Sequence, residues 1–411
     1  MVNISRALRQ RLAATAVIFV VFCTTFASNG PSVLYVVYQQ RDHFSSLVVT
    51  AIFSTYAIAV LATLLVIGQL SDVIGRRPML IGGAALLIVS SAVFALARSA
   101  WWLFAARGLQ GIATGTLVAA AGAALVELSA PQHRRRASLM NTVSFLTGAA
   151  AGSIAFGVMV QYLPSPTVLP FVVEMVLDGL ALVGVIGLVT ETVQERGARW
   201  RLQRPSVPPS MLWPFFLCAI TMGLGWSLGG LYGSLSPTMT RQILHVSSHV
   251  VAGAVLFTFN LIGGLTQLAF SRRTPRASMF SGLLFVALGA LLIQLAFSEH
   301  SAPIFFAATL LAGSGGGMAF VGSLALVNEL APPERRAEVL AAYNLVGYLA
   351  LSVPIVAVGV LTSAIGLRPA SLAFTGVLIL GAAGVAVMLR RAPTVGGAAE
   401  AVAFEEIPVG S

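Results

Sequence analysis

The stretch GQLSDVIGRRP, Gly68 to Pro78, decides the fold, because it places three charged residues and two glycines between two long apolar runs. Asp72, Arg76 and Arg77 fall close together in a chain in which only 9% of the residues are charged. The apolar runs on either side are each long enough for a helix to cross a hydrocarbon layer of roughly 30 Å. The stretch therefore predicts a polar turn between two membrane-spanning helices.

The composition of the whole chain points to the same class of protein. Of 411 residues, 57% are hydrophobic, and the mean hydropathy is +0.90. A soluble domain carries about 25% charged residues, so this chain is not a soluble domain. The net charge of +10 comes from arginines that lie in short groups between apolar runs, a distribution that argues against nucleic-acid binding. The composition predicts a polytopic membrane protein that binds lipid and no nucleic acid.

The apolar runs are long enough to span a membrane, and there are twelve of them. Backbone groups in lipid must be paired within their own segment, so each run is expected to be helical. The sequence therefore predicts an all-α membrane protein with twelve transmembrane helices. The expected spans cover residues 12–37, 46–67, 79–97, 101–126, 138–162, 168–190, 211–235, 247–270, 278–297, 302–327, 338–362 and 370–389.

The arginines predict the orientation of these spans, because cytoplasmic loops carry an excess of positive charge. With an even number of spans, 19 arginines fall on the side of both termini, and four fall on the other side. The first run is too long for the core of a signal peptide and is expected to remain as a span. The sequence predicts a multi-pass protein of the plasma (inner) membrane with both termini in the cytoplasm.

The chain also divides into two similar halves. The longest hydrophilic interruption runs from Glu191 to Ser210, after the sixth span. ALVELSAPQHRRRA at the end of the fourth span resembles ALVNELAPPERRA at the end of the tenth. Such repeats are typical of transporters built from two helix bundles. The sequence predicts two six-helix bundles, at residues 1–190 and 211–390, with a cytoplasmic central loop at 191–210 and a cytoplasmic tail at 391–411.

The opening stretch resembles the signature loop of the major facilitator superfamily. That signature is Gly, three residues, Asp, two residues, Gly, Arg, and Arg or Lys. Its positions here are Gly68, Asp72, Gly75, Arg76 and Arg77, in the expected loop of a twelve-span chain. The family often has a basic residue directly after the Asp, and this chain does not. The resemblance implies a major facilitator fold that works by alternating access.

The resemblance also implies a latch between the two bundles in the outward-open state. Asp72 is expected to lie near the N-terminus of the eleventh span, around Ala337, where the helix dipole favours a carboxylate. Arg76 is expected to pair with Glu127, at the cytoplasmic end of the fourth span. The alternative is that Arg76 and Arg77 only anchor the topology.

Charged residues inside the spans are the next candidates for function. The motif RGLQG, from Arg107 to Gly111, resembles a fourth-span motif of proton-coupled members of the family. An intramembrane arginine is costly and normally faces a cavity or a partner. Arg107 and Gln110 are therefore expected at the substrate cavity, and the alternative is that Arg107 extends to the outer membrane interface.

Glu174 and Asp178 lie four residues apart in the sixth span and so share one helical face. Two carboxylates this close in a low dielectric repel each other, so at least one is expected to hold a proton. The pair is a candidate for proton coupling. The alternative is a hydrated pair at the outer end of the span, or one paired with Arg107.

The resemblance implies a cavity lined by spans one, four, seven and ten and flanked by spans two, five, eight and eleven. Polar and aromatic side chains in these spans are candidate substrate contacts, and the same polarity also occurs in plain helix packing. The family's antiporter motif in the fifth span has Ser153 where a proline is usual, which weakens the case for an antiporter. The candidate contacts are Asn29, Arg107, Gln110, Asn141, Trp226, Asn260, Tyr343 and Asn344.

These observations predict a secondary transporter driven by an ion gradient, with protons as the expected ion, since no nucleotide-binding motif is present. A mostly apolar cavity favours efflux of drug-like or metabolite-like compounds. The alternatives are proton-coupled uptake of a small acid, with Arg107 binding its carboxylate, and a non-transporting sensor on a transporter scaffold. No catalytic cluster, cofactor motif or metal-ligand set is found, so an enzyme is not expected. We expect a monomer.

Overall fold

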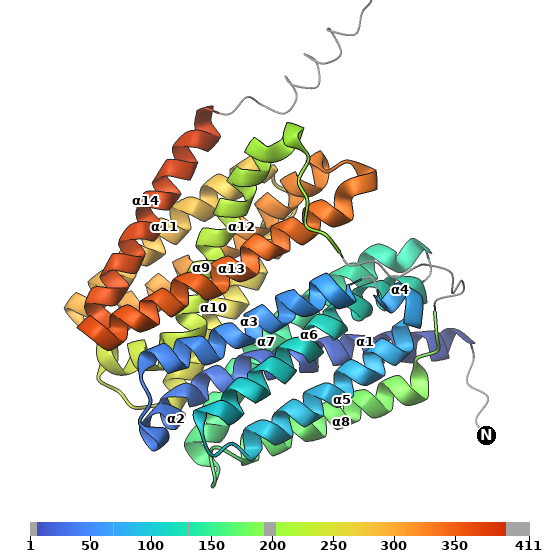
Figure 1. The fold of residues 1–411 in the computed structure, drawn as a ribbon, viewed down its shortest axis with the longest axis horizontal. Helices are drawn as coiled ribbons and strands as arrows, with labels where there is room; N and C mark the ends of the chain where they lie inside the picture. The colour runs from blue at the N-terminus through green and yellow to red at the C-terminus, as the bar shows by residue number, and fades with distance from the viewer. Residues whose placement is uncertain (1–5, 69, 130, 193–202, 392–411) are drawn as a thin grey trace, which may run out of the picture.

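The computed structural model describes residues 6–68, 70–129, 131–192 and 203–391. These residues form helices joined by short turns, and no strand occurs among them (Figure 1). The long helices of the first half are α1 (Arg6–Asn29), α3 (Ser46–Ile67), α5 (Arg76–Ala95), α6 (Ala100–Leu128), α7 (Arg134–Tyr162) and α8 (Leu169–Leu188). Those of the second half are α9 (Leu212–Leu244), α10 (His249–Phe270), α11 (Pro275–Glu299), α12 (Ala302–Leu330), α13 (Arg336–Ile365) and α14 (Leu367–Arg391).

Twelve of the described segments are long and apolar enough to span a membrane, which confirms the all-α, twelve-span prediction. Two spans run further than expected. The first continues to Asp42, because the turn η1 (Gly30–Leu34) leads directly into α2 (Tyr35–Asp42). The seventh continues to Leu244, because α9 accommodates Pro237 inside the helix. In both places a proline near the C-terminal end of the span made the apolar run look shorter than the span is.

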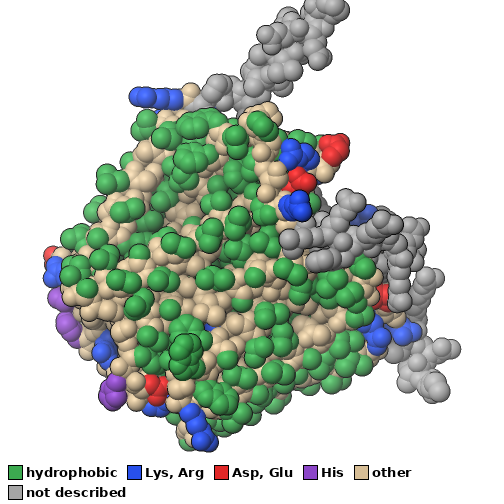
Figure 2. All heavy atoms as spheres, viewed as in Figure 1, with side chains coloured by type: hydrophobic (Ala, Val, Ile, Leu, Met, Phe, Trp, Pro, Cys, Tyr) green, Lys and Arg blue, Asp and Glu red, His purple; other side chains and the backbone are tan. Residues whose placement is uncertain are grey.

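The helices pack as two groups that follow the order of the chain (Figure 1). In the first group α1 packs against α6, α7 and α8, and α5 packs against α6 and α8. In the second group α12 packs against α9, α10 and α11, and α14 packs against α11 and α13. Large apolar side chains point outward, such as Val183 (68% exposed) and Leu380 (75% exposed). Figure 2 shows hydrophobic side chains over most of the visible face, with charged side chains mainly toward its ends.

The two groups touch mainly through two helix pairs, α3 with α13 and α7 with α10, and α9 makes smaller contacts with α3 and α2. We call the end with the turns after α3, α6, α8, α10 and α12 the arginine-rich end, and the other end the opposite end. Close contacts lie toward the opposite end. The Leu47 amide donates to Ser363 Oγ (3.2 Å), and Ser54 Oγ donates to the Ser352 carbonyl (3.2 Å). The space between the groups is therefore closed at the opposite end.

Backbones also meet without intervening side chains at this closure. A Cβ atom on Gly253 of α10 would lie 2.7 Å from the Ser153 carbonyl and 3.1 Å from Gly157 Cα, both in α7. Those distances are shorter than a side chain tolerates, so only glycine permits this approach. Gln161 Oε1 accepts from the His249 amide (2.8 Å) one turn further out. We call this contact between α7 and α10 the outer seal.

Candidate functional site

The turn that carries GQLSDVIGRRP contains the short helix α4 (Leu70–Ile74) and then Gly75. Gly75 has φ 113° and ψ 154°, a conformation that residues with a Cβ rarely adopt. A Cβ atom there would also collide with the Glu191 carboxylate. The second glycine of the signature is therefore required by both the backbone conformation and the packing.

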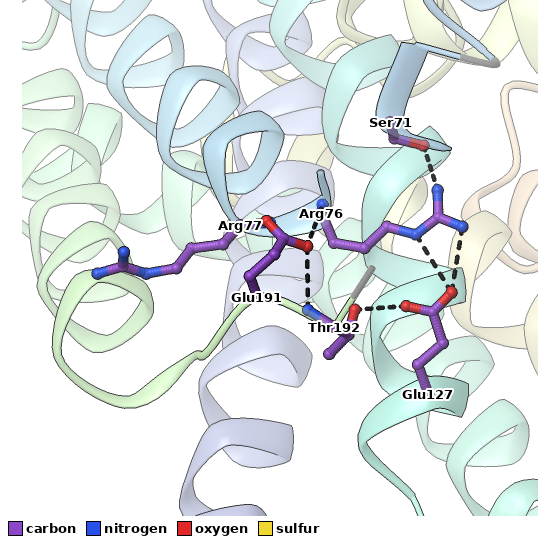
Figure 3. A network of polar contacts seen from close by, with 6 residues as sticks. All are labelled: Ser71, Arg76, Arg77, Glu127, Glu191 and Thr192. Carbon is purple, nitrogen blue, oxygen red and sulfur yellow. Dashed lines mark hydrogen bonds and ion pairs between the residues drawn. The ribbon is translucent and has the colours of Figure 1, made fainter. Parts of the chain in front are cut away.

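Glu191, which follows α8, caps the start of α5 (Figure 3). The Arg76 amide donates to its Oε1 (2.9 Å), and the Arg77 amide donates to its Oε2 (3.3 Å). The first amides of a helix have no partner within the helix, and a carboxylate there also interacts favourably with the helix dipole. The segment after the sixth span is thereby fixed to the signature turn.

The side chain of Arg76 links this turn to the fourth span (Figure 3). Its Nη2 donates to Glu127 Oε1 (3.1 Å), and its Nη1 donates to Ser71 Oγ. Thr192 Oγ1 donates to the other oxygen of Glu127. The Arg76 side chain is 11% exposed and that of Glu127 35%, so the pair is only partly shielded from solvent. Arg76 and Glu127 therefore lie together as the sequence predicts, while their role as a latch stays a prediction.

The expected partner of the eleventh span, Asp72, lies in α4, but its side chain is outside the described part of the structure. The start of α13 is contacted by Gln203 of the central loop. The Gln203 amide donates to the Leu65 carbonyl of α3 (3.1 Å), and its Nε2 donates to the Ala337 carbonyl of α13 (3.1 Å). Gln203 thus connects the two groups of helices at the arginine-rich end. Gly68 lies beside Gln203, whose Oε1 would be 2.8 Å from a Cβ atom on that glycine. Arg77, at the start of α5, donates from Nη2 to the Ile186 carbonyl of α8 (2.9 Å).

A cavity of about 180 Å³ lies between the two groups at the arginine-rich end. Its walls come from α3, α6 and α13, and Gln203 contributes a polar group. Asn344 lines it, so one of the expected substrate contacts lies at this cavity. The residues that line it include Leu61, Leu64, Gly68, Ala119, Gln203 and Asn344.

Arg107 is buried inside the first group, with 0% of its surface exposed. Its Nε donates to Tyr35 Oη (2.7 Å), and its Nη1 donates to the Ser28 carbonyl (2.8 Å) and to Gln110 Oε1 (2.6 Å). Gln110 Nε2 in turn donates to the Ala27 carbonyl (2.9 Å). In this conformation both side chains join α6 to the junction of α1 and α2 and do not reach the 180 Å³ cavity. Arg107 Nη2 has no hydrogen-bond partner among the described residues.

Glu174 and Asp178 are also buried in the first group, each 1% exposed. Glu174 Oε1 lies 2.6 Å from Ser91 Oγ of α5. The other oxygen of Glu174 and both oxygens of Asp178 have no hydrogen-bond partner among the described residues. Arg107 lies close enough for its charge to act on Glu174. Both carboxyl groups are therefore buried within the bundle, and no salt bridge to either is found among the described residues.

The remaining candidate contacts lie in several environments. Asn260 Nδ2 donates to Asn29 Oδ1 (3.3 Å), which joins α10 to α1 across the two groups. Trp226 stacks on Phe320 at 5.9 Å between ring centroids, and it meets Tyr348 edge-on. Tyr343 is fully buried, with its hydroxyl 2.7 Å from Ser323 Oγ, and Asn141 Oδ1 is buried in α7 without a described partner.

Sequence reasoning missed several side chains that hold this arrangement together. Glu191 and Thr192 lie at the start of a hydrophilic loop in the sequence. The flanking residues do not indicate that this loop contacts the signature turn. Gln203 is likewise an ordinary polar residue of that loop. Tyr35 could have been considered, because a buried tyrosine hydroxyl usually has a hydrogen-bond partner and a buried arginine needs acceptors.

A profile of the Major Facilitator Superfamily matches residues 17–353 and 269–407. The multidrug resistance protein MdtL of Escherichia coli (strain K12) is 27% identical over 269 residues, which is 63% of this chain and 66% of that protein. The inner membrane transport protein YajR of the same strain is 41% identical over 78 residues, which is 19% of this chain and 17% of that protein. The alignments thus span less than two thirds of these curated relatives.

Solved structures show the same fold at low sequence identity. A POT family transporter in complex with a thioalcohol-conjugated peptide superposes with a TM-score of 0.76 at 14% identity, covering 92% of this chain and 96% of that one. A bacterial homologue of the human lysosomal transporter Spinster, inward-facing and occupied, superposes with a TM-score of 0.75 at 14% identity over the same shares of the two chains. Together with the match of the family profile over most of the sequence, the twelve-helix fold leads to one conclusion: this chain belongs to the major facilitator superfamily.

Proposed function

We propose that this major facilitator transporter exports amphipathic organic molecules and that protons drive the export. The similarity to a multidrug resistance protein over 63% of the chain is the observation that supports efflux. The mostly apolar walls of the cavity between the helix groups suit compounds with a large apolar part. The direction of transport, the substrate class and the coupling ion are all parts of this proposal.

The carboxylates of α8 support protons as the coupling ion. Burying an ionised carboxylate without a partner is very costly, so Asp178 is expected to be neutral in this conformation. Ser91 Oγ lies 2.6 Å from Glu174 and 3.0 Å from the Leu87 carbonyl, and a serine has a single proton to donate. A neutral Glu174 that donates to Ser91 satisfies both distances.

Arg107 connects the carboxyl groups of Glu174 and Asp178 to the rest of the first group of helices. When the carboxylates lose their protons, the new negative charge attracts Arg107, whose Nη2 is without a described partner. Arg107 is bonded to the junction between α1 and α2, so a movement of its side chain would act on the wall of the transport pathway. We infer that proton release and the change of access are coupled through this arginine.

The alternative of acid uptake rested on Arg107 as the binding group for a carboxylate. Arg107 is buried and already donates three hydrogen bonds, so it is not available to a substrate in this conformation. A non-transporting sensor would not need unpaired carboxylates inside a bundle, since they destabilise the fold. Both alternatives are therefore less well supported than efflux.

The test is the transport of a panel of labelled compounds in inside-out membrane vesicles with an acidic interior. At least one amphipathic compound should accumulate, and a protonophore should abolish its accumulation. Accumulation that persists with the protonophore would contradict proton coupling. Accumulation only in right-side-out vesicles would favour uptake over efflux.

We also propose that the arginine-rich end faces the cytoplasm, on the strength of the 19-to-4 distribution of arginines. Cysteines introduced at Ser165, in the turn before α8, and at Ser210, before α9, would be exposed at opposite ends. The native Cys23 and Cys218 are buried and should not react. An impermeant thiol reagent added to whole cells should label the first position only, and labelling of Ser210→Cys alone would reverse the orientation.

A further inference from the structure

A second cavity, of about 430 Å³, lies between α1 and α7 in the half of the molecule near the arginine-rich end. We call it the α1–α7 groove. It is separate from the cavity between the helix groups, because all its lining residues belong to the first group. Its walls are mostly apolar and are formed by Ile18, Phe19 and Phe22 of α1 and by Leu139, Met140 and Val143 of α7.

The groove opens toward the membrane and away from the transport pathway. Met140 and Val158 of α7 are 18 residues apart, which is five full helical turns, so they share one face of the helix. They are 43% and 41% exposed. At the level of Val158 the outer seal closes the space between the groups, with Gly157 against Gly253. The exposed face of α7 at that level is therefore its outer surface, and Met140 lies on the same surface.

The hydroxyl groups of the groove are already used within the helices. Ser144 Oγ donates to the Ile18 carbonyl (2.6 Å), and Thr147 Oγ1 donates to the Val143 carbonyl (2.7 Å). Thr15 Oγ1 donates to the Arg11 carbonyl (3.0 Å). These three hydroxyl groups already donate to backbone carbonyls, so the groove presents a mainly apolar surface to a bound molecule.

Two arginines, Arg136 and Arg11, lie where the groove meets the arginine-rich end. Arg136 of α7 lines the groove, is exposed, and has no ion pair or hydrogen bond from its side chain to another described residue. Arg11 lies one helical turn before Thr15, on the same face of α1, and is exposed as well. No acidic residue is among the residues that line the groove. The charge at this mouth is thus positive, and no described residue that lines the groove compensates it.

We propose that the α1–α7 groove binds one anionic phospholipid of the leaflet at the arginine-rich end. An acyl chain occupies the surface formed by Phe19, Phe22 and Met140, and the phosphate lies between Arg136 and Arg11. Basic sites between transmembrane helices are suited to anionic head groups for this reason. The site holds α1 and α7 together near their ends and does not depend on the proposed direction or coupling of transport.

Thermal unfolding of the full chain in detergent, titrated with phosphatidylglycerol or with phosphatidylethanolamine of the same acyl chains, tests this site. Wild-type protein should show a rise in unfolding temperature at lower concentrations of phosphatidylglycerol. Arg136→Gln and Arg11→Gln should each weaken that apparent affinity by about fivefold, the effect of one arginine near an anionic surface. Arg134→Gln, on the same helix and equally exposed but outside the groove, is the matched control.

A variant that fills the groove separates the acyl-chain site from a general charge effect. Val143→Trp places a large side chain at a position that is 42% exposed, so it should fold and should lose the response to phosphatidylglycerol. An unchanged lipid preference in Arg136→Gln and Val143→Trp would overturn the proposal. Competition for the site by a transported compound, with the same dependence on Arg136, would overturn it in favour of a substrate-entry site.

Discussion

Replacing Glu174 by Gln and Asp178 by Asn together is expected to abolish proton-driven transport while leaving downhill exchange of substrate intact. Both replacements keep the shape of the side chain and remove the titrating proton. Both groups are buried and are proposed to be neutral in this conformation, so neutral amides of the same shape add no charge to the bundle and should not unfold the protein. Loss of coupling without loss of stability is the result that distinguishes a proton site from a structural pair.

Three measurements on the double variant decide the matter. Uphill accumulation in proteoliposomes with an imposed pH gradient should be absent, and substrate exchange without a gradient should continue. The unfolding temperature should equal or exceed that of the wild type. Glu299→Gln, exposed at the end of α11, is the matched control and should transport normally. Wild-type accumulation in the double variant would remove these residues from the mechanism.

Replacing Gly253 by Leu is expected to stop transport by preventing the outer seal from closing. The new side chain would run into the backbone of Ser153 and Gly157, neither of which can move aside as a side chain could. Overpacking of this kind costs about 1–3 kcal/mol or more, which shifts an equilibrium between two states by roughly 5- to 150-fold. The variant should therefore favour the state that is open at the opposite end.

The expected shift can be measured with a cysteine at Asn344, which lines the cavity between the groups at the arginine-rich end. Its reaction with a thiol reagent supplied from that end should slow in Gly253→Leu. Gly384→Leu, in α14, is the matched control, because a Cβ atom there meets nothing within 4 Å. If Gly253→Leu transports at the wild-type rate, the contact between α7 and α10 does not gate access.

The spans and the pairing of Arg76 with Glu127 could be predicted because they depend on patterns along the chain. Lipid requires long apolar helices, so hydropathy alone locates twelve spans. Arg76 and Glu127 both lie at ends of spans that meet the same membrane face, so their pairing follows from the topology. The ends of the first and seventh spans could not be placed in this way, because Pro31 and Pro237 are tolerated within continuing helices.

The environment of the intramembrane charges could not be predicted from the same patterns. The periodicity of an α-helix shows that Glu174 and Asp178 lie on one face of α8. It does not show which other helix that face packs against. Arg107 is buried against the junction at η1, where Tyr35 of α2 reaches its guanidinium, and the helical periodicity does not locate that contact. The contacts of Glu191 and Gln203 depend on the path of a loop, which hydropathy does not constrain.

The most direct test of alternating access is a pair of distances measured by pulsed electron resonance on spin-labelled protein. One pair of labels, at Ser45 and Ala364, spans the opposite end, and the other, at Ser138 and Arg272, spans the arginine-rich end; all four positions are exposed. Changes of pH and addition of substrate should lengthen one distance while shortening the other. Two distances that stay fixed, or that lengthen together, would contradict the account.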